Sequence, residues 1–269
     1  TFPLGENEIC YTLTDSSGMQ LEECCFTVTV EDTEAPEIVS CEAGDVFGFG
    51  VQTFSNDEGE CSTILVGEFQ ITDNCTDSLE SYIVFTEPNG VIDVDTLIGG
   101  NGTYSVNKAF AKGLTTYEVI AIDSAGNETS CTGQIEVIDT EEPMITCPTP
   151  TNPYATDMGA CTYMVQDSVL DATFSDNCPD ATLVHDYVLA PQNNTLAGAE
   201  FAVGSTDVTW TVTDASGNTA TCQITVTVED TLNPQFVNCP SDTITVGNDV
   251  SNCDGGVNWS IPVAEDNCG

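Results

Sequence analysis

Acidic residues recur at fixed places in three similar stretches of the chain. The stretches at 12–36, 120–143 and 212–234 each hold an Asp-x-x-Gly turn, a strand with cysteine, and a second acid ahead of a proline. Carboxylate and amide oxygens from separate loops suit Ca²⁺, a hard cation that takes six to eight oxygen ligands. An Asp before a turn can also simply accept hydrogen bonds from that turn, and Asp-x-x-x-Pro can end one strand and begin another.

The overall charge excludes several kinds of partner. The 269-residue chain has 44 Asp and Glu, only Lys108 and Lys112 as basic residues, and a net charge of −42. Nucleic acids and anionic membranes would repel it, and no apolar run is long enough to insert in a membrane. Because crowded carboxylates repel one another, we expect salt or divalent cations to screen or bind them. Plentiful apolar residues that alternate with polar ones favour a folded chain over a disordered one.

The cysteines indicate an oxidising compartment. Fourteen cysteines fall at recurring spacings, which predicts disulfides and an extracellular, secreted or cell-surface protein. No Cys-x-x-Cys pair is present, so a zinc or iron–sulfur site is not expected. His185 is the single histidine and has no equivalent in the repeats, and no serine-protease or phosphate-loop motif occurs. The sequence therefore predicts that the chain is not an enzyme.

The landmarks repeat at the length of a whole domain. Asp123, Cys131 and Asp139 recur 91 residues later as Asp214, Cys222 and Asp230. We divide the chain into the C-terminal half of a domain, a complete domain with insertions, a second complete domain, and the N-terminal half of a fourth, at 1–32, 33–139, 140–230 and 231–269. This division predicts a window from a longer repetitive polypeptide.

Period-two alternation predicts strands throughout. Val208, Trp210 and Val212 share one face, and the apolar residues of 222–229 alternate with polar ones in the same way. The two segments are joined at "DASGN", a short hairpin in which Gly217 can adopt a positive φ. Short alternating strands in domains of about 100 residues predict an all-β chain of β-sandwiches.

The segment "VTWTVTDASGNTATCQITVTVEDTLNPQFVNCP", followed by "NWSIPVAEDNCG", resembles the hyalin repeat (HYR) family. This is an immunoglobulin-like extracellular domain found in the echinoderm matrix protein hyalin, in animal surface proteins and in very large bacterial surface adhesins. The resemblance implies tandem immunoglobulin-like β-sandwich domains arranged as an elongated rod. The favoured context is a Bacteroidota-type surface adhesin.

Four cysteines per repeat allow three connectivities. The favoured scheme joins neighbours in the first strands and joins each Asp-Asn-Cys cysteine to the cysteine of the last strand, which leaves Cys24 and Cys268 without partners. Cys10 and Cys25 fall on the solvent face of adjacent strands, where a bridge is reasonable. The predicted pairs are Cys10–Cys25, Cys41–Cys61, Cys75–Cys131, Cys147–Cys161, Cys178–Cys222 and Cys239–Cys253.

In an immunoglobulin-like sandwich, the loop after the second strand and the last hairpin lie at the pole where the chain enters. Three acid-bearing segments should therefore meet at each domain entrance and bind Ca²⁺. Their layout is similar to the junctions of cadherins, where calcium stiffens domain boundaries. The candidate ligands are Asp32, Glu34, Asp73, Asp123 and Asn127, then Asp139, Glu141, Asp176, Asp214 and Asn218, and finally Asp230 and Asp266.

Two kinds of glycosylation motif occur. One is the Asn-x-Ser/Thr sequon, and the other is the Asp-Ser/Thr-aliphatic tripeptide, which resembles the O-glycosylation motif of Bacteroidota. The candidate sites are Asn101, Asn127, Asn193 and Asn258, and Ser78, Thr96, Ser168 and Thr243.

The primary functional hypothesis is a structural and adhesive stalk segment of a giant extracellular repeat protein or surface filament, braced by disulfides and junctional Ca²⁺. Its partners would be neighbouring repeats of the same polypeptide or filament, and surface glycans. One alternative is a carbohydrate- or ligand-binding module that uses the insertions at 46–60 and 87–107 as recognition loops. Another is a self-assembling filament subunit whose half-domains complete each other between chains.

Overall fold

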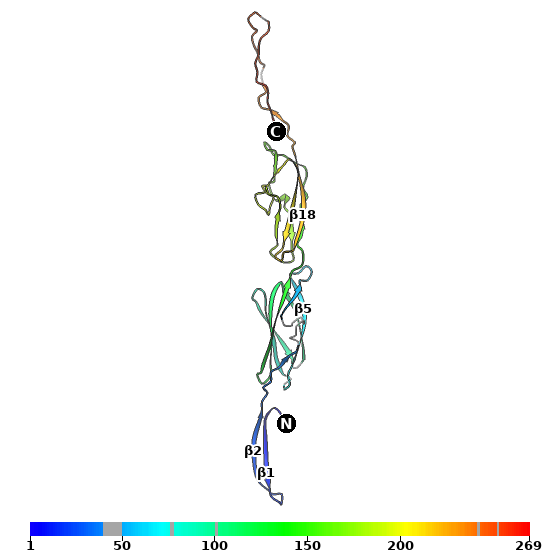
Figure 1. Cartoon of the computed structure of the whole chain (residues 1–269), viewed down its shortest axis with the longest axis vertical. Coiled ribbons are helices and arrows are strands. Elements are labelled where there is room, and N and C mark those ends of the chain that lie inside the picture. The colour runs from blue at the N-terminus through cyan, green and yellow to red at the C-terminus, as the bar shows by residue number, and fades with distance from the viewer. Residues whose placement is uncertain (40–49, 76–77, 100–101, 241–242, 252) are drawn as a thin grey trace. The chain divides into compact units, whose positions relative to one another are not determined.

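The computed structural model describes residues 1–39, 50–75, 78–99, 102–240, 243–251 and 253–269 (Figure 1). Strands dominate these residues, and their one helical element is a single 3₁₀ turn at Ser168–Leu170. Within the same residues, no helix is long and apolar enough to cross a membrane. The all-β class predicted from the alternation is confirmed. The chain divides into two compact units, Thr1–Glu141 and Glu142–Gly269.

The first unit begins with a two-stranded hairpin. Strand β1 (Gly5–Thr14) pairs antiparallel with β2 (Gln20–Val30), and Cys10 lies directly opposite Cys25. These two cysteines are disulfide-bonded with 4.1 Å between their Cα atoms, in agreement with the predicted pair. Leu13 remains largely exposed beside them. The hairpin is therefore held by strand pairing and a surface disulfide rather than by a buried core.

A sandwich of two sheets completes the first unit. One sheet has five strands in the order β4 (Val51–Ser55), β10 (Glu128–Ile138), β9 (Gly113–Ile122), β6 (Leu79–Thr86) and β7 (Ile92–Gly99). The other has three, in the order β3 (Glu37–Ile38), β5 (Ser62–Thr72) and β8 (Gly102–Ala111). Pairing is antiparallel except between β4 and β10, which run parallel. This arrangement is an immunoglobulin-like β-sandwich.

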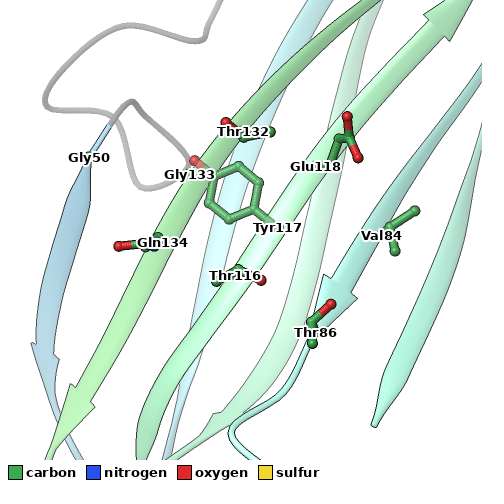
Figure 2. Close-up of a pocket in the computed structure, with 9 residues that line it drawn as sticks. All are labelled: Gly50, Val84, Thr86, Thr116, Tyr117, Glu118, Thr132, Gly133 and Gln134. Carbon is green, nitrogen blue, oxygen red and sulfur yellow. The ribbon is translucent and has the colours of Figure 1, made fainter. Parts of the chain in front are cut away.

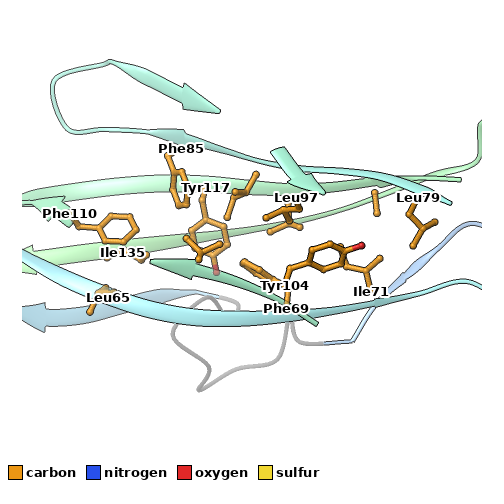
Figure 3. Close-up of a cluster of buried hydrophobic side chains, with 14 of the residues drawn as sticks. Leu65, Phe69, Ile71, Leu79, Phe85, Leu97, Tyr104, Phe110, Tyr117 and Ile135 are labelled. Atoms are coloured by element: carbon orange, nitrogen blue, oxygen red, sulfur yellow. The ribbon is translucent and has the colours of Figure 1, made fainter. Parts of the chain in front are cut away.

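The core of the first sandwich comes from the inward faces of both sheets (Figure 3). Alternate residues of β5 are buried, which is the pattern that the period-two sequence predicts. Phe69 of that strand is fully buried, as is Ile135 of β10 on the opposite sheet. Phe85 and Phe110 meet edge to face with 5.5 Å between ring centroids. The sandwich holds the loops at its ends on a rigid frame.

The second unit contains a smaller sandwich. Its main sheet has the order β12 (Tyr154–Ala155), β18 (Thr219–Glu229), β17 (Gly204–Thr213) and β15 (Thr182–His185). Two further strand pairs are β11 (Met144–Thr146) with β14 (Thr173–Ser175), and β13 (Thr162–Met164) with β16 (Glu200–Ala202). Trp210, Phe201 and Val226 are fully buried in the core. The register of β17 and β18 sets Thr209 opposite Gln223, as the hairpin in the sequence predicts.

Residues 231–269 are more open. Within the described part, β19 (Gln235–Phe236) pairs antiparallel with β20 (Ala264–Glu265). Phe236, Trp259 and Ile261 are more than half exposed. This segment therefore buries little apolar surface.

The disulfides of the second sandwich correct the predicted scheme. Cys147 is bonded to Cys222, with 5.8 Å between Cα atoms, so the predicted pairs Cys147–Cys161 and Cys178–Cys222 are wrong. The reason is packing: Cys147 directly follows β11, which lies against β18, the strand that carries Cys222. Spacing along the sequence cannot show this contact between sheets.

The remaining pairs also differ from the prediction. Cys161 is bonded to Cys268, which was expected to lack a partner. Cys24, Cys75, Cys239 and Cys253 are free thiols, so the predicted pairs Cys75–Cys131 and Cys239–Cys253 are wrong. Cys61 and Cys131 are disulfide-bonded. The predicted pair Cys41–Cys61 includes Cys41, which lies outside the described residues.

Candidate metal centre

Three aspartates from distant parts of the first unit lie together. Asp32 follows β2, Asp73 follows β5, and Asp123 opens the turn between β9 and β10. Each offers a carboxylate oxygen, and these oxygens all lie within 4.8 Å of one another. We call Asp32, Asp73 and Asp123 the aspartate triad. The convergence of connector, loop and hairpin that the sequence predicts is present here.

The hairpin turn fixes the position of Asp123. Its Oδ1 accepts hydrogen bonds from the backbone N–H of Ala125 (2.9 Å) and of Asn127 (2.8 Å), while Gly126 adopts a φ of 91°. Its Oδ2 accepts a third hydrogen bond from Asn127 Nδ2 (2.7 Å). Desolvation raises the pKa of Asp123, but these hydrogen bonds outweigh it and hold the pKa below its ordinary value. Asp123 is therefore a charged member of the triad.

Asn127 connects the turn to the incoming chain. Its Nδ2 also donates to the backbone carbonyl oxygens of Asp32 and Glu34, at 3.2 Å each. The sequence proposed Asn127 as a metal ligand and a glycosylation site, but the structure shows its amide nitrogen engaged in three hydrogen bonds. A glycan on that nitrogen would disrupt them. Asn127 positions the connector that carries Asp32.

The other two aspartates have fewer partners. Asp32 Oδ1 accepts from the Glu34 N–H at 3.3 Å, and Asp73 Oδ1 accepts from the Cys75 N–H at 2.9 Å. Asp32 Oδ2 is buried and has no hydrogen-bond partner among the described residues. An unpartnered buried carboxylate oxygen is costly, which favours a ligand at this position.

The chain has no spare cationic side chain for the triad. Its two basic residues are paired elsewhere: Lys108 Nζ lies 2.5 Å from Asp93 and 3.5 Å from Glu87, and Lys112 Nζ lies 3.6 Å from Asp139. Two carboxylates 4.8 Å apart repel by about 3 kcal/mol at an effective dielectric constant of about 20. The triad therefore calls for a cation from solution.

Glu34 and Glu141 each accept a hydrogen bond from a neighbouring loop, and their role as metal ligands stays a prediction. Glu34 Oε2 accepts a hydrogen bond from Asn74 Nδ2, and Glu141 Oε2 accepts from the backbone N–H of Gly59 at 2.8 Å. Both glutamates thus tie a connector to a neighbouring loop and lie outside the triad. Sequence reasoning missed Asn74, although the recurring Asp-Asn-Cys motif marks the position.

The equivalent acids of the next repeat are Asp139, Asp176 and Asp214. Asp214 Oδ1 accepts from the N–H groups of Ser216 (2.9 Å) and Asn218 (2.7 Å), and its Oδ2 accepts from Asn218 Nδ2 (2.8 Å). Asp176 accepts from the Cys178 N–H at 3.3 Å, as Asp73 does from Cys75. Each hairpin therefore builds the same local geometry.

The last two candidates are Asp230 and Asp266. Asp230 Oδ1 accepts from the Leu232 N–H at 3.1 Å, and Asp266 Oδ1 accepts from the Asn267 N–H at 2.8 Å. Within the described residues, neither belongs to a group of three acids.

Two other places in the molecule were candidates for chemistry. A shallow hollow on the first sandwich is lined by residues that include Thr86, Thr116, Glu118 and Gln134 (Figure 2). It presents one carboxylate without a partner base. His185 is buried, with Nε2 3.1 Å from the carbonyl oxygen of Thr195, and it packs edge to face on a tryptophan. Neither place offers the paired groups that acid–base or nucleophilic catalysis requires.

Most candidate glycosylation sites lie on the surface. The exposed ones are Ser78, Thr96, Ser168, Asn193, Thr243 and Asn258. Asn101 lies outside the described residues. Exposure permits modification at the six sites, which remains a prediction.

A family model matches the part of the chain that forms the second sandwich. Residues 138–228 match the HYR domain family model. The chain is also 26% identical to Hyalin of Strongylocentrotus purpuratus and 28% identical to Hyalin of Lytechinus variegatus, in each case over 100% of the chain. It spans 20% and 45% of the length of these relatives. The HYR match, the hyalin likeness and the disulfides indicate an extracellular repeat module.

Solved structures that match large parts of the chain have low TM-scores. Human CDH23 EC21-23 is 14% identical with a TM-score of 0.33, and the match covers 76% of this chain and 73% of that one. Sidekick-1 immunoglobulin domains 1–4 are 13% identical with a TM-score of 0.35, covering 81% and 57%. These scores are too low to support any inference about function.

Proposed function

We propose that the chain is a structural and adhesive segment of a larger extracellular repeat protein, in which Ca²⁺ bound by the aspartate triad fixes the connector at the domain entrance. The single observation that carries the calcium proposal is the triad, in which three carboxylates from three segments lie within 4.8 Å. Neighbouring repeats and surface glycans are the proposed partners. A large bacterial surface adhesin, of the Bacteroidota type, is the proposed context.

The donor set favours calcium over other metals. Aspartate carboxylates are hard oxygen donors, and no His or Cys ligand belongs to the triad. Three carboxylates supply three to six oxygens, depending on whether each binds through one or both atoms, and water can complete the six to eight that Ca²⁺ takes. Extracellular calcium modules commonly bind at ~10⁻⁴–10⁻³ M, so the expected affinity lies in this range.

Calcium would hold the connector mechanically. Asp32 belongs to the connector, whereas Asp73 and Asp123 belong to loops of the sandwich. Asn127 already ties the connector to the hairpin through two hydrogen bonds to its carbonyl oxygens. An ion shared by Asp32 and the two loop aspartates would add charged contacts to the same attachment and remove their mutual repulsion.

Equilibrium dialysis of the intact chain against radioactive calcium tests the proposal. At millimolar calcium we expect saturable binding to the unmodified chain, and one bound ion fewer per chain in the double variant Asp32→Asn/Asp73→Asn. The control is Asp15→Asn, because Asp15 opens a similar hairpin turn but belongs to no group of three acids within the described residues. This variant should bind as many ions as the unmodified chain. Absence of saturable binding to the unmodified chain up to 10-fold above the expected ~10⁻³ M range would refute the calcium proposal.

A further inference from the structure

One face of the first hairpin carries apolar side chains that remain exposed. Tyr11 is 68% exposed, Leu13 58% and Phe26 47%. The rings of Tyr11 and Phe26 stack with 6.2 Å between their centroids. Strands β1 and β2 form a sheet of two, so no other strand of the described residues pairs with either edge. The hairpin therefore presents an apolar face and two unpaired strand edges, which are features of interaction sites.

The last hairpin of the second sandwich has the same face, but there it is buried. In the register of β1 and β2, Tyr11 lies directly opposite Cys24. In the register of β17 and β18, Trp210 lies directly opposite Cys222. Trp210 is fully buried, whereas Tyr11 is largely exposed. The two faces follow one pattern, and the second of them shows what covers such a face.

The strand that opens the second sandwich covers part of its hairpin. Ile145 of β11 packs against the core cluster that includes Trp210. Cys147, directly after β11, is bonded to Cys222. We call residues 142–150 the opening segment. It is held on the hairpin by an apolar side chain and a disulfide, only two residues apart.

Cys24 is the position at which the first hairpin lacks this bond. Cys24, Cys131 and Cys222 each lie eight residues before the aspartate of a connector. Cys131 and Cys222 are disulfide-bonded, whereas Cys24 is an exposed free thiol. A shallow hollow of about 210 Å³ is lined by residues that include Cys24, Tyr11 and Leu13. The free thiol and the apolar face therefore lie together, at the place where the equivalent hairpin holds an opening segment.

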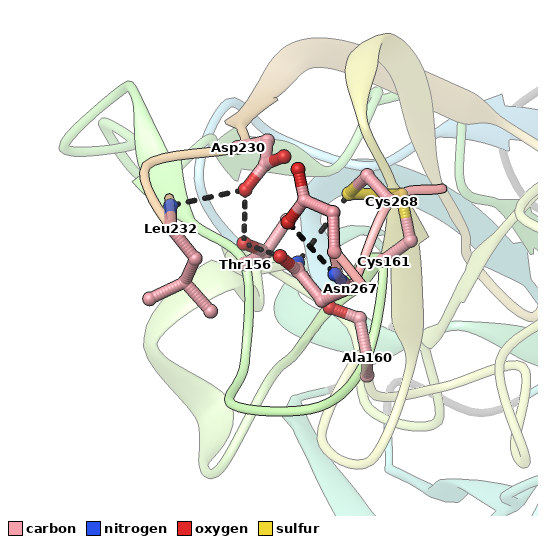
Figure 4. Close-up of a disulfide and its surroundings, with 8 residues drawn as sticks. Thr156, Ala160, Cys161, Asp230, Leu232, Asn267 and Cys268 are labelled. Atoms are coloured by element: carbon pink, nitrogen blue, oxygen red, sulfur yellow. Dashed lines mark hydrogen bonds between the residues drawn. A yellow bond between two sulfur atoms is a disulfide. The ribbon is translucent and has the colours of Figure 1, made fainter. Parts of the chain in front are cut away.

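A disulfide already fixes a segment of one repeat on another in this chain. Cys161 of the second sandwich is bonded to Cys268 of segment 231–269 (Figure 4). Beside this bond, Asn267 Nδ2 donates to the carbonyl oxygen of Ala160 at 2.9 Å (Figure 4). Attachment by a disulfide together with contacts of neighbouring residues is therefore a device that the molecule uses.

We propose that the first hairpin accepts an opening segment, a short apolar strand that ends in cysteine, and that Cys24 forms a disulfide with this cysteine. The segment comes from another part of the larger extracellular repeat protein, so the inference rests on the proposed function. A segment tethered in the same polypeptide has an effective concentration of the order of millimolar, which a second copy in dilute solution does not reach. When the bond forms, the two thiols lose two protons and two electrons to a disulfide of the extracellular space, which is reduced to two thiols.

Capture of a synthetic opening segment tests the proposal. The peptide has the sequence of residues 142–150, with Cys147 as its thiol, and is mixed at about 1 mM with the intact chain in a buffer of reduced and oxidised glutathione. A calcium chelator is present throughout, so a failure of the calcium proposal does not affect the result. We expect mass spectrometry to find the peptide on Cys24 about 10-fold more often than on the exposed thiols Cys239 and Cys253. Hydrogen exchange in β1 and β2 should slow on capture.

Matched variants separate docking from unselective exchange of thiols. A peptide with Ile145→Asp keeps its cysteine but loses the apolar contact, so the exposed thiols should capture it equally. The chain variant Leu13→Gln should lose the selectivity in the same way. Thr27→Gln lies on the opposite face of β2 and should keep the selectivity. Leu13 and Thr27 are both exposed, so neither substitution should unfold the hairpin.

Three results would overturn the proposal. The first is an equal distribution of the unmodified peptide over the free thiols. The second is capture of the Ile145→Asp peptide at Cys24 as often as the unmodified one. The third concerns the source of the segment. A disulfide from Cys24 to a second copy, found without peptide in a micromolar mixture of isotope-labelled and unlabelled chains, would show that a second copy is the occupant.

Discussion

Two hairpins of the first unit have the same kind of turn but differ in what the turn contacts. In the turn between β1 and β2, Asp15 Oδ1 accepts from the N–H groups of Ser17 and Met19, at 2.9 Å each. In the turn between β9 and β10, Asp123 accepts from equivalent positions at nearly the same distances. The residue four positions after the aspartate differs: Met19 is 64% exposed, whereas Asn127 binds the incoming connector.

The comparison separates turn formation from a candidate metal site. An aspartate stabilises its own turn in both hairpins, so the Asp-x-x-Gly motif alone says nothing about a metal. What distinguishes the second hairpin is the asparagine, the burial of Asp123 and the two further acids beside it. The combined pattern of Asp-x-x-Gly-Asn with an acidic connector therefore predicts the triad, and Asp-x-x-Gly-Met predicts a turn only.

The largest expected effect concerns how the first hairpin is held. In Cys10→Ser/Cys25→Ser, loss of a bond that closes a loop of 15 residues should destabilise the hairpin by about 3 kcal/mol. Hydrogen exchange should show lost protection in β1 and β2 and unchanged protection in β9 and β10. Equal loss of protection in both hairpins would show that the first hairpin stabilises the sandwich, and this would contradict the comparison.

Making the second turn resemble the first is the next test. Asn127→Met removes the three hydrogen bonds of its amide and should lower the free energy of unfolding of the first sandwich by about 2 kcal/mol. Urea denaturation monitored by far-ultraviolet circular dichroism measures the change. The reverse variant Met19→Asn is the matched control and should change stability by less than about 0.5 kcal/mol, since Met19 is 64% exposed. Equal effects of the two variants would refute the role of Asn127.

A charge substitution in the triad should change stability by an amount that depends on calcium. Asp73→Asn keeps an acceptor oxygen for the Cys75 N–H and removes one negative charge. In a chelator it should raise the free energy of unfolding by about 1–2 kcal/mol, because repulsion from Asp32 and Asp123 is relieved. At a calcium concentration 10-fold above a Kd in the extracellular range, binding should raise the free energy of unfolding of the unmodified chain by about 1.4 kcal/mol. The same calcium should raise that of the variant by less.

Asp15→Asn is the control for this calcium dependence. Its effect should be the same with calcium and with chelator. If Asp73→Asn also showed no dependence on calcium, the triad would have no role in binding the ion.

The smallest expected effect is a titration of the first turn. The hydrogen bond from the Ser17 hydroxyl, followed by that from the Met19 N–H, holds the pKa of Asp15 below its ordinary value of 3.8. The stabilisation by the charged carboxylate is therefore present above pH 3.8 and is lost as the pH falls through the lower folded value. Carbon-13 NMR of the carboxyl group should show this low pKa. A value above 3.8 would contradict the hydrogen bonding described here.

The sequence predicted the parts that depend on local pattern. Alternation predicted the strands, and the hairpin register correctly placed Cys10 opposite Cys25. The recurrence of acids at three places, together with the sandwich topology, predicted that Asp32, Asp73 and Asp123 would meet. These features follow from the two-residue period of a strand and from where loops emerge from a sandwich.

The failures concern contacts that no local pattern encodes. The cysteine scheme assumed that every bond closes within one repeat, but Cys268 bonds to the preceding repeat at Cys161. Cys147 reaches Cys222 because β11 lies against β18, a packing of separate sheets. The direction of a long side chain was also beyond prediction, so the hydrogen bonds of Glu34 and Glu141 to neighbouring loops were not foreseen.

The most direct test of the account is an experimental structure of the chain crystallised in millimolar calcium, with anomalous diffraction to identify the ion. We expect a calcium ion bound by Asp32, Asp73 and Asp123, with metal–oxygen distances of about 2.3–2.6 Å. An anomalous map without a peak at the triad, with the three carboxylates turned away from one another, would contradict the account.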